Sequence, residues 1–452
     1  MSFRLLLSFL FVFVFLIFPV SADEKKPSRK EIQQFVRDRL TDSVLLLDRH
    51  FRVPETGQYL DVLRIGEKDQ SNLSSSIAAT GIGLVSLAIG DALGVIDNAE
   101  AKAVRTLRNL LNQDRKSGFK IDRSSNGWFP HFVDPYTGET RRASEGKYST
   151  IDTALLSAGA AIAARYFSAK SYTRGKGESR VFLLGGQLVG RVRWSSAIKN
   201  VDRGLVHLVF NGDEETPLER VFATPFDEYA LLPCIAKRGE QLAGRQGPAH
   251  ELFAKHYSNA KNLPMNDFQG HPVIGKRNGS FIAHFTHLFV YYYCNDINRQ
   301  GAYRTSLREM ASADRKHFHN DGKDLFPKHL WGLGAGAEIK FDEEGKVQYS
   351  AYGVNHLQKN PNNTASPAIM AGLAPVFNRR DEDDPILDLY KLWRDRTCIY
   401  EHEGIEFLWR CSARNTDLKV KRVEAVDFST YLLGLAGRDR AIGLAFFRHF
   451  NL

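Results

Sequence analysis

The chain has few cysteines and lacks several catalytic signatures. Only four cysteines occur in 452 residues and no two form a CxxC pair, so a zinc or thiol-redox site has little support. The sequence also lacks GxSxG, HExxH, a P-loop, and a GxGxxG between a strand and a helix. Nucleophilic-serine, zinc-protease and nucleotide chemistry therefore have no motif to support them. We expect neither a metal nor another cofactor.

Long runs of one charge are also absent. The formal net charge is +9, but no five lysines or arginines follow one another and no nucleic-acid motif is present. We therefore expect no nucleic-acid partner. The diffuse charge fits general solubility, or else attraction to an anionic surface or a decorated polysaccharide. Hydrophobic residues make up 43% and charged residues 25%, as in ordinary globular proteins.

Beyond the N-terminus no apolar run approaches about 18 residues, so we expect no membrane association of the mature chain. At the N-terminus, Arg4 precedes an apolar run over residues 5–18, and small residues stand before a cleavage site after Ala22. This layout predicts a signal peptide over residues 1–22 and a periplasmic or secreted product. An uncleaved anchor is the alternative, but the run is shorter than the roughly 20 residues that span a bilayer.

The cysteines suggest one crosslink in an exported protein. Cys398 and Cys411 flank a segment that reads as a hairpin, which would place them together. With Cys234 and Cys294, however, three connectivities exist, and the sequence does not choose among them.

Apolar residues recur at helical spacing through most of the chain. Residues 73–90 and 149–167 are apolar nearly all round and predict buried helices. Other helices are predicted over residues 31–49, after Asp97, and over 180–192, 225–238, 280–296, 302–318, 366–376, 384–394 and 427–450. The segments 204–210 and 337–350 read as β-hairpins inserted between helices.

About twelve helices, about half of them wholly buried, fit a double ring with six inner and six outer helices. We therefore predict an all-α fold, an (α/α)6 toroid of about twelve helices with small β-hairpin insertions. It would form a single catalytic domain over residues 23–452 and act as a monomer. No short internal repeat is visible, which argues against a repeat solenoid.

A turn-rich loop over residues 127–138, GWFPHFVDPYTG, carries Trp128, His131 and Asp134 just before a buried helix. Aromatic rings on a loop suit sugar recognition, because the C–H face of a pyranose packs on a π surface. The alternative is that these aromatic side chains fill the core. The residues alone do not decide between the two.

Two helix starts carry carboxylates. Ser149 and Asp152 fit a capping box, in which the Asp152 carboxylate accepts a backbone N–H, and the helix N-terminus favours its negative charge. That suits a base or a sugar hydrogen-bond acceptor, and Glu145 lies just before this helix. Further on, Asp227 fits a capping box begun by Thr224. Glu228 is not needed for that cap, and its aromatic neighbours would raise its pKa and favour a general-acid role.

A later helix carries His284 and His287, which share one face with Tyr291. A metal site would need a third ligand that the sequence does not identify. We therefore favour buried histidines that hydrogen-bond a polar cleft.

In this order, these segments resemble the glucoamylase-like domain that includes the endo-β-1,2-glucanases of glycoside hydrolase family 144. The most specific match is the pattern E-x-x-x-STID-TALL-x-AG over residues 145–159. The looser matches are the serine-rich helix at 74–90, the loop at 127–138, EYALL at 228–232, the helix around His287, the segment at 331–333, and residues 364–377 and 426–429. The resemblance covers roughly residues 70–435.

The resemblance implies an (α/α)6 toroid with a sugar cleft on one face, and hydrolysis of a β-glucan, most specifically β-1,2-glucan, with inversion. The substrate would be a polysaccharide or an oligosaccharide. Glu228 would be the acid, and Glu145 and Asp152 the other essential carboxylates. The implied substrate-binding set is Trp128, His131, Asp134, Asp227, His284, His287, Trp331 and Asp427.

Two segments depart from the family pattern and keep alternatives open. Asn362 and Asn363 stand where the family has an acidic residue and glycine, and residues 283–289 read AHFTHLF where it has HQYSHxW. The asparagines favour a non-catalytic glycan-binding relative. The positive charge and the shared face of His287 and Tyr291 favour a polysaccharide lyase on the same fold.

Overall fold

The computed structural model describes most of the chain after the N-terminus. It covers residues 26–70, 72–142, 147–211, 216–217, 222–226, 230–258, 262–275, 280–290, 302–319, 328–341, 343–344, 347–349, 353–354, 360, 363–379, 381–446 and 450. The predicted signal peptide, Glu145, Asp227 and Glu228 lie outside these residues. Within them, no helix combines the length and hydrophobicity needed to cross a bilayer.

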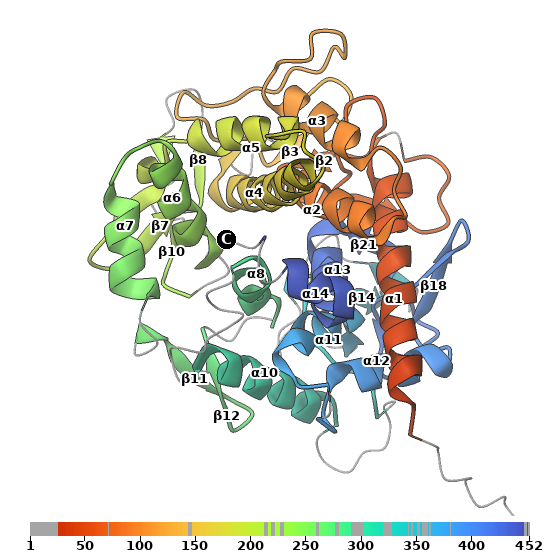
Figure 1. The fold of residues 1–452 in the computed structure, drawn as a ribbon. Coiled ribbons are helices and arrows are strands. Elements are labelled where there is room, and N and C mark those ends of the chain that lie inside the picture. The colour runs from red at the N-terminus through yellow and green to blue at the C-terminus, as the bar shows by residue number, and fades with distance from the viewer. Residues whose placement is uncertain are drawn as a thin grey trace, which may run out of the picture.

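Six helices form a closed inner ring (Figure 1). Each packs against the next, and the last packs against the first. In ring order they are α2 (Ile77–Leu93), α4 (Thr150–Thr173), α6 (Leu231–Leu242), α8 (Phe281–Phe289), α11 (Pro367–Leu373) and α13 (Ala425–Arg438).

Six further helices pack on the outside of this ring. They are α1 (Arg29–Leu46), α3 (Ala99–Leu110), α5 (Arg180–Gly190), α7 (Pro248–Leu252), α10 (Ala302–His319) and α12 (Pro385–Arg394). A short helix, α14 (Arg440–Ala445), follows α13. The predicted all-α, (α/α)6 toroid is confirmed.

Sequence pattern explains which helices lie inside. In α2, every residue from Ile77 to Gly90 is buried, because the helix is apolar all round and has neighbours on every side. In the outer helix α3, burial is confined largely to one stripe that includes Ala103, Leu107 and Leu110. A helix with one apolar stripe can cover only one surface, so it packs on the outside.

Glycines bring two inner helices together. Gly159 of α4 lies so near α2 that a Cβ added to it would overlap the carbonyl oxygen of Gly81. A Cβ added to Gly81 would in turn lie 2.5 Å from the Leu156 Cα. The backbones of α2 and α4 are therefore in direct contact, and any side chain at Gly159 must push them apart.

Gly159→Ala is expected to lower the free energy of unfolding by at least about 2 kcal/mol, because overpacked cores must shift backbone to make room. Denaturant unfolding followed by tryptophan fluorescence measures this. The matched control is Gly186→Ala in α5, where an added Cβ has no atom within 4 Å. There alanine should raise stability by about 0.5–1 kcal/mol. Equal effects of the two changes would contradict the close-contact interpretation.

Short antiparallel sheets join the loops at the helix ends. The pairs are β1 (Val62–Arg64) with β21 (Arg422–Glu424), β11 (Met265–Phe268) with β12 (His271–Ile274), β13 (Ala335–Gly336) with β16 (Gly353–Val354), β14 (Ile339–Phe341) with β15 (Val347–Tyr349), β17 (Thr364–Ala365) with β20 (Cys411–Ser412), and β18 (Ile399–His402) with β19 (Ile405–Leu408).

Three-stranded sheets also occur. Their strand orders are β2 (Ser75–Ser76), β3 (Phe132–Val133), β4 (Thr140–Arg141); β5 (Tyr148–Ser149), β8 (Val209–Asn211), β9 (Thr216–Pro217); and β10 (Phe222–Ala223), β7 (Leu205–His207), β6 (Ile198–Asn200).

Two local predictions need correction. Residues 204–210 do not form a hairpin, because β7 and β8 break at Leu208 and pair within different sheets. The helix predicted from residue 225 begins at Leu231 instead, so Thr224 is not its N-cap. Phe226 has a φ of 58°, which no α-helix can contain, and its ring packs 5.0 Å from that of Tyr257. By contrast, the predicted hairpin within 337–350 is present as β14 and β15.

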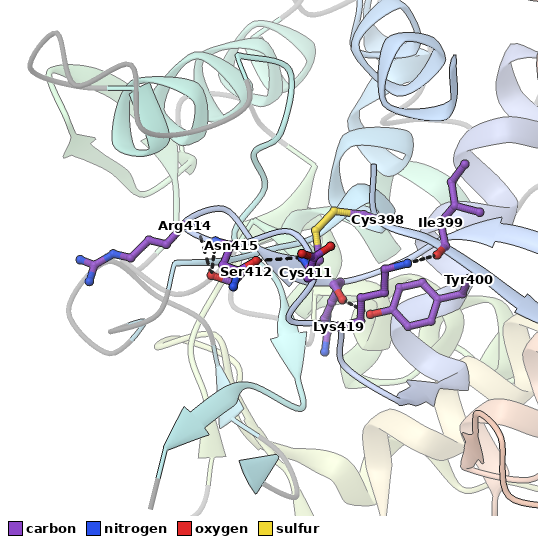
Figure 2. The surroundings of a disulfide bond; sticks show 10 residues. Cys398, Ile399, Tyr400, Cys411, Ser412, Arg414, Asn415 and Lys419 are labelled. Atoms are coloured by element: carbon purple, nitrogen blue, oxygen red, sulfur yellow. Dashed lines mark hydrogen bonds between the residues drawn. A yellow bond between two sulfur atoms is a disulfide. The ribbon is translucent and has the colours of Figure 1, made fainter. Parts of the chain in front are cut away.

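Cys398 and Cys411, whose pairing the sequence suggests but does not decide, form a disulfide with a Cα–Cα distance of 5.6 Å (Figure 2). It joins the residues that flank the β18–β19 hairpin. Lys419 reinforces this region by donating to the carbonyl of Ile399 at 2.7 Å. The hairpin is thus fixed at its base. Cys234 is buried in α6, and Cys294 lies outside the described residues.

Replacing both Cys398 and Cys411 by serine is expected to lower the free energy of unfolding by about 3 kcal/mol, the entropic value for a closed loop of this length. Unfolding midpoints with and without a thiol reductant measure it. The reductant should shift the wild type and leave the double variant unchanged. A double variant as stable as the oxidised wild type would contradict the expected contribution.

Candidate active site

The N-terminal ends of inner helices α2, α4 and α13 meet on one face of the ring. The backbone N–H of Ile77, at the start of α2, donates to the carbonyl of His131 at 3.2 Å. The N–H of Ser149, before α4, donates to Phe129 at 3.0 Å, and that of Ala425, at the start of α13, donates to Asp61 at 2.9 Å. The loop over residues 128–134 and the segment before β1 therefore lie against these helix starts.

One further segment ties the starts of α8 and α11 to this face. This segment covers residues 330–338. The N–H of Ser280, before α8, donates to the carbonyl of Leu333 at 2.7 Å, and the N–H of Ser366, before α11, donates to the carbonyl of Gly332 at 3.1 Å. Ala337 in the same segment donates its N–H to Glu424, before α13, at 3.0 Å. Helix N-termini favour negative charge, so this face is suited to carboxylates.

Asp152 and His131 form the first pair on this face. Ser149 caps α4 by accepting the N–H of Asp152 at 3.3 Å, as predicted. The return bond of the capping box is not made, because the N–H of Ser149 donates to Phe129 instead. The Asp152 carboxylate lies 3.5 Å from His131 Nε2, and the side chains are 8% and 37% exposed. Asp152 is therefore nearly buried, and His131 carries most of the exposed surface of the pair.

Asp61 lies beside this pair. Burial raises the pKa of its carboxyl, and the charge of Asp152 raises it further, while His131 and a hydrogen bond from the Ser76 side chain lower it. The exposed Arg142 also lowers the pKa of Asp61. Asp61, Asp152 and His131 thus share one electrostatic environment at the starts of α2 and α4.

Asp427 and Glu424 extend the row of carboxylates to α13. Arg410 Nη2 lies 3.2 Å from Asp427 Oδ1, and its Nη1 lies 3.4 Å from Glu424 Oε2. Burial raises the pKa of Asp427 to about 7. Attraction to Arg410 opposes this rise, whereas repulsion from Glu424 and Asp61 adds to it. Burial likewise raises the pKa of Glu424, which Arg410 opposes. At neutral pH Asp427 therefore carries a proton part of the time.

Arg410 has no exposed surface, and a glycine makes room for it. Gly336 has a φ of 114°, a conformation that L side chains rarely adopt, and a Cβ there would overlap the guanidinium of Arg410. The segment over residues 330–338 is thus shaped around this cation. One guanidinium faces two carboxylates, so the cluster has an excess of negative charge unless a proton is bound.

Two predicted substrate-binding tryptophans lie in the core. Trp128 is 0% exposed, donates its indole N–H to Ser196 at 2.9 Å, and packs against Trp194 and Phe210. Trp331 is also 0% exposed and donates to Asp388 at 2.9 Å. Neither ring offers a face to a sugar, so the core-filling alternative for the aromatic residues applies to both.

The two predicted histidines of α8 are buried as well. His287 lies 2.9 Å from the carbonyl of Gly372 through Nε2, and burial lowers its pKa to about 4. Burial lowers the pKa of His284 too, and neither side chain reaches solvent. The preference for buried histidines over a metal site is consistent with this placement, whereas direct contact with a sugar is not.

Asp134 has a structural role in its turn. Its carboxylate accepts the N–H groups of Tyr136 at 2.9 Å and Thr137 at 2.8 Å, and it pairs with Arg141. These bonds shape the loop that presents His131. Glu145, Asp227 and Glu228 fall outside the described residues, so their predicted roles stay predictions.

Sequence reasoning missed Asp61, Arg142, Glu424 and Arg410. Asp61 follows no recognisable motif, and it reaches the site because β1 pairs with β21, which ends at Glu424. Arg410 follows the hairpin closed by the disulfide, and only tertiary packing places it beneath Asp427. The one available signal was the suggested pairing of Cys398 with Cys411, which would mark the neighbouring Arg410 as a fixed position.

One hollow among the described residues lies away from this face. It is lined by Arg29, Phe377, Arg379 and Arg438. Arg438 ends α13, so the hollow is roughly 15 Å from Asp427 along the helix axis. It contains no second row of carboxylates, and we assign the candidate site to the opposite, N-terminal face.

No protein-family model matches the chain, and no curated protein sequence matches it. Solved structures do resemble it. An endo-β-1,2-glucanase from Chitinophaga pinensis, in complex with sophorotriose and glucose, has a TM-score of 0.68 at 16% identity, covering 93% of this chain and 95% of that one. A provisionally named glucoamylase from Bacteroides uniformis has a TM-score of 0.67 at 15% identity, covering 94% and 96%.

This chain therefore has the fold of the glucoamylase-like and endo-β-1,2-glucanase structures. A D-mannose isomerase is also similar, with a TM-score of 0.50 at 11% identity, covering 90% of this chain and 99% of that one. Since similar toroids carry out different reactions, the fold alone does not specify the chemistry, which depends on the residues of the site.

Asp427→Asn is expected to change how stability depends on pH. The folded pKa of about 7 exceeds the reference value of 3.8, so the native state binds a proton that the unfolded chain has released. This proton adds at most about 4 kcal/mol to the free energy of unfolding. The contribution is complete below about pH 4 and is lost as the pH rises through 7. The difference between wild-type and variant unfolding free energies, measured from pH 4 to about 8, should show this loss.

The exposed Asp417 supplies the control for this measurement. Asp417→Asn should give a curve parallel to that of the wild type. If Asp427→Asn also runs parallel, Asp427 does not titrate in this range and the electrostatic description of the cluster is wrong.

Proposed function

We propose that the chain is an exported glycoside hydrolase that cleaves a β-glucan, most specifically β-1,2-glucan, by an inverting acid–base mechanism. The observation that carries this proposal is the row formed by Asp152, Asp61 and Asp427 on the N-terminal face of a closed (α/α)6 ring. Glycoside hydrolysis needs carboxyl groups in different environments, and Asp152 and Asp427 are placed differently on this face.

The carboxylates lie in different environments. Asp152 stands at the start of α4, where the helix dipole favours its negative charge, and faces His131. Asp427 is buried and holds its proton up to about pH 7. Enzymes commonly place two carboxyl groups in different environments so that one acts as the acid and the other as the base.

In the proposed reaction, Glu228 donates a proton to the glycosidic oxygen as the bond to the anomeric carbon breaks. A carboxylate accepts a proton from a water molecule that attacks the opposite face of that carbon. Asp152 is our first candidate for this base, and Glu145 is the other essential carboxylate. Acid and base would lie about 6.5–9.5 Å apart to leave space for the water.

The choice of β-1,2-glucan rests on two independent supports. One is the sequence pattern at residues 145–159, which resembles that of the endo-β-1,2-glucanases. The other is the fold similarity to an endo-β-1,2-glucanase solved with sophorotriose. The half-exposed His131 and the exposed Arg142, whose guanidinium lies over the Phe132 ring at 4.7 Å, are the described side chains we propose to contact the sugar.

Export to the periplasm or the exterior is part of the same proposal. Residues 1–22 have the layout of a signal peptide, and the Cys398–Cys411 disulfide suits an oxidising compartment. Intact-mass measurement of the protein recovered from its native compartment should give a chain beginning at Asp23.

The two alternatives, a non-catalytic glycan-binding relative and a polysaccharide lyase, lose part of their support. Asn363 has a φ of 46°, a conformation that asparagine tolerates well, so its presence has a backbone reason apart from any loss of activity. His287 is buried against Gly372, so it does not present the face that motivated a lyase. Hydrolysis therefore remains the reaction that the site favours.

Incubation of the purified mature protein with glucans of defined linkage tests the function. We expect β-1,2-glucan to be cleaved, with the α-anomer appearing first in the proton NMR spectrum because inversion converts a β bond. Glu228→Gln and Asp152→Asn should each lower kcat by at least about 100-fold. The exposed Glu139 gives a matched control, and Glu139→Gln should retain full activity.

Each departure has a distinct meaning. The β-anomer appearing first would exclude inversion. Binding without cleavage across the panel would indicate the glycan-binding relative, and a product absorbing in the ultraviolet would indicate a lyase. Full activity of Glu228→Gln with loss in Asp427→Asn would move the acid role to Asp427.

A further inference from the structure

A cluster of two histidines and a glutamate lies outside the candidate active site. Helix α1 continues into a π-helical turn, η1 (Leu47–Phe51), which carries His50. His402 ends strand β18, and Glu403 follows it in the turn to β19. This hairpin lies beside α1, which packs on β19 (Figure 1). Single π-helical turns are rare and occur frequently at functional sites.

The three side chains converge. The rings of His50 and His402 lie edge to face with centroids 4.6 Å apart, and His50 Nδ1 lies 3.7 Å from Glu403 Oε2. One potential ligand atom from each residue lies within 4.8 Å of the other two. Among the described residues, this is the one group of three histidine, cysteine or acidic side chains with that proximity.

The histidines are not engaged in other bonds. His50 Nε2 is buried and has no hydrogen-bond partner, and the 3.7 Å from Nδ1 to Glu403 is too long for a hydrogen bond. The ring nitrogen that faces Glu403, His50 Nδ1, is therefore open to a ligand.

We propose that His50, His402 and Glu403 bind one divalent transition-metal ion of the zinc class, with water as the fourth ligand. Two imidazoles and a carboxylate are a ligand set that zinc accepts, at about 2.0–2.2 Å from each atom. Adjacent ligands of a tetrahedral ion lie about 3.4 Å apart, so the site must contract by roughly 1 Å. Glu403 is 72% exposed and free to make most of that movement.

The ion would act as a clamp. The hairpin formed by β18 and β19 is fixed at its base by Cys398–Cys411, and the ion fixes its tip to the end of α1. The strand that leaves this hairpin leads directly to Arg410, the cation beneath Asp427. Metal binding therefore stabilises the support of the candidate active site without entering its chemistry. The nearby charge of Arg49 opposes cation binding and limits the affinity.

The test uses untagged, metal-stripped mature protein and zinc chloride as the probe, with magnesium chloride for comparison. We expect equilibrium dialysis at micromolar zinc to give one ion per chain, and zinc but not magnesium to raise Tm. His402→Gln and His50→Gln should each weaken zinc binding at least tenfold. Loss of a residue that only hydrogen-bonds a metal ligand weakens affinity roughly 10–100-fold, and loss of a ligand itself should cost no less.

His271 supplies the matched control. It lies 2.8 Å from Glu309, a histidine–glutamate pair that lacks a second histidine, and His271→Gln should leave zinc binding unchanged. Absence of stoichiometric binding overturns the proposal, as does binding that survives in His402→Gln. Loss of binding in His271→Gln would place the ion elsewhere and overturn it too. Dialysis reads out binding directly, so the result stands whatever the glucan assays show.

Discussion

Closure of the helical ring is the constraint on which the rest of the structure depends. Pairing of β1 with β21 and packing of α13 against α2 join the first part of the chain to the last. Asp61 and Asp427, from opposite ends of the sequence, influence each other's charge only because of this closure. Close backbone contact between α2 and α4 then sets where Asp152 stands relative to Asp61. The candidate site is therefore a product of the whole ring.

The buried charges beneath that site work against stability. Removing Arg410 and two carboxylates from water costs several kcal/mol per ion, which ion pairing offsets only in good geometry. A hydrophobic cluster could fill the same volume at no such cost. The arrangement leaves Asp427 with a proton available near neutral pH, next to a second acid in Asp61. Perturbed carboxyl groups of this kind are typical of catalytic sites, although purely structural networks also produce them.

Particular residues show where sequence reasoning succeeds and where it does not. The all-round apolar pattern of residues 73–90 predicted an inner helix, because a helix without a polar face must be surrounded. The same composition argument could not place Trp128 or Trp331, because an aromatic ring serves a core and a sugar cleft equally well. The prediction of a helix from residue 225 was wrong because Phe226 adopts a left-handed conformation, which a phenylalanine side chain gives no reason to expect.

The sequence by itself determined the helical architecture and the cap of Ser149 on α4, since each depends on spacing or on chain neighbours. It left the Cys398–Cys411 crosslink as one of three pairings, which the tertiary structure decided. Only the tertiary structure decided that Asp61, Arg410 and Glu424 accompany Asp427, and that the predicted tryptophans lie in the core. The physical reason is the distance along the chain over which each interaction acts. Local periodicity and capping act within a few residues, whereas burial and charge pairing depend on which distant segments the closed ring brings together.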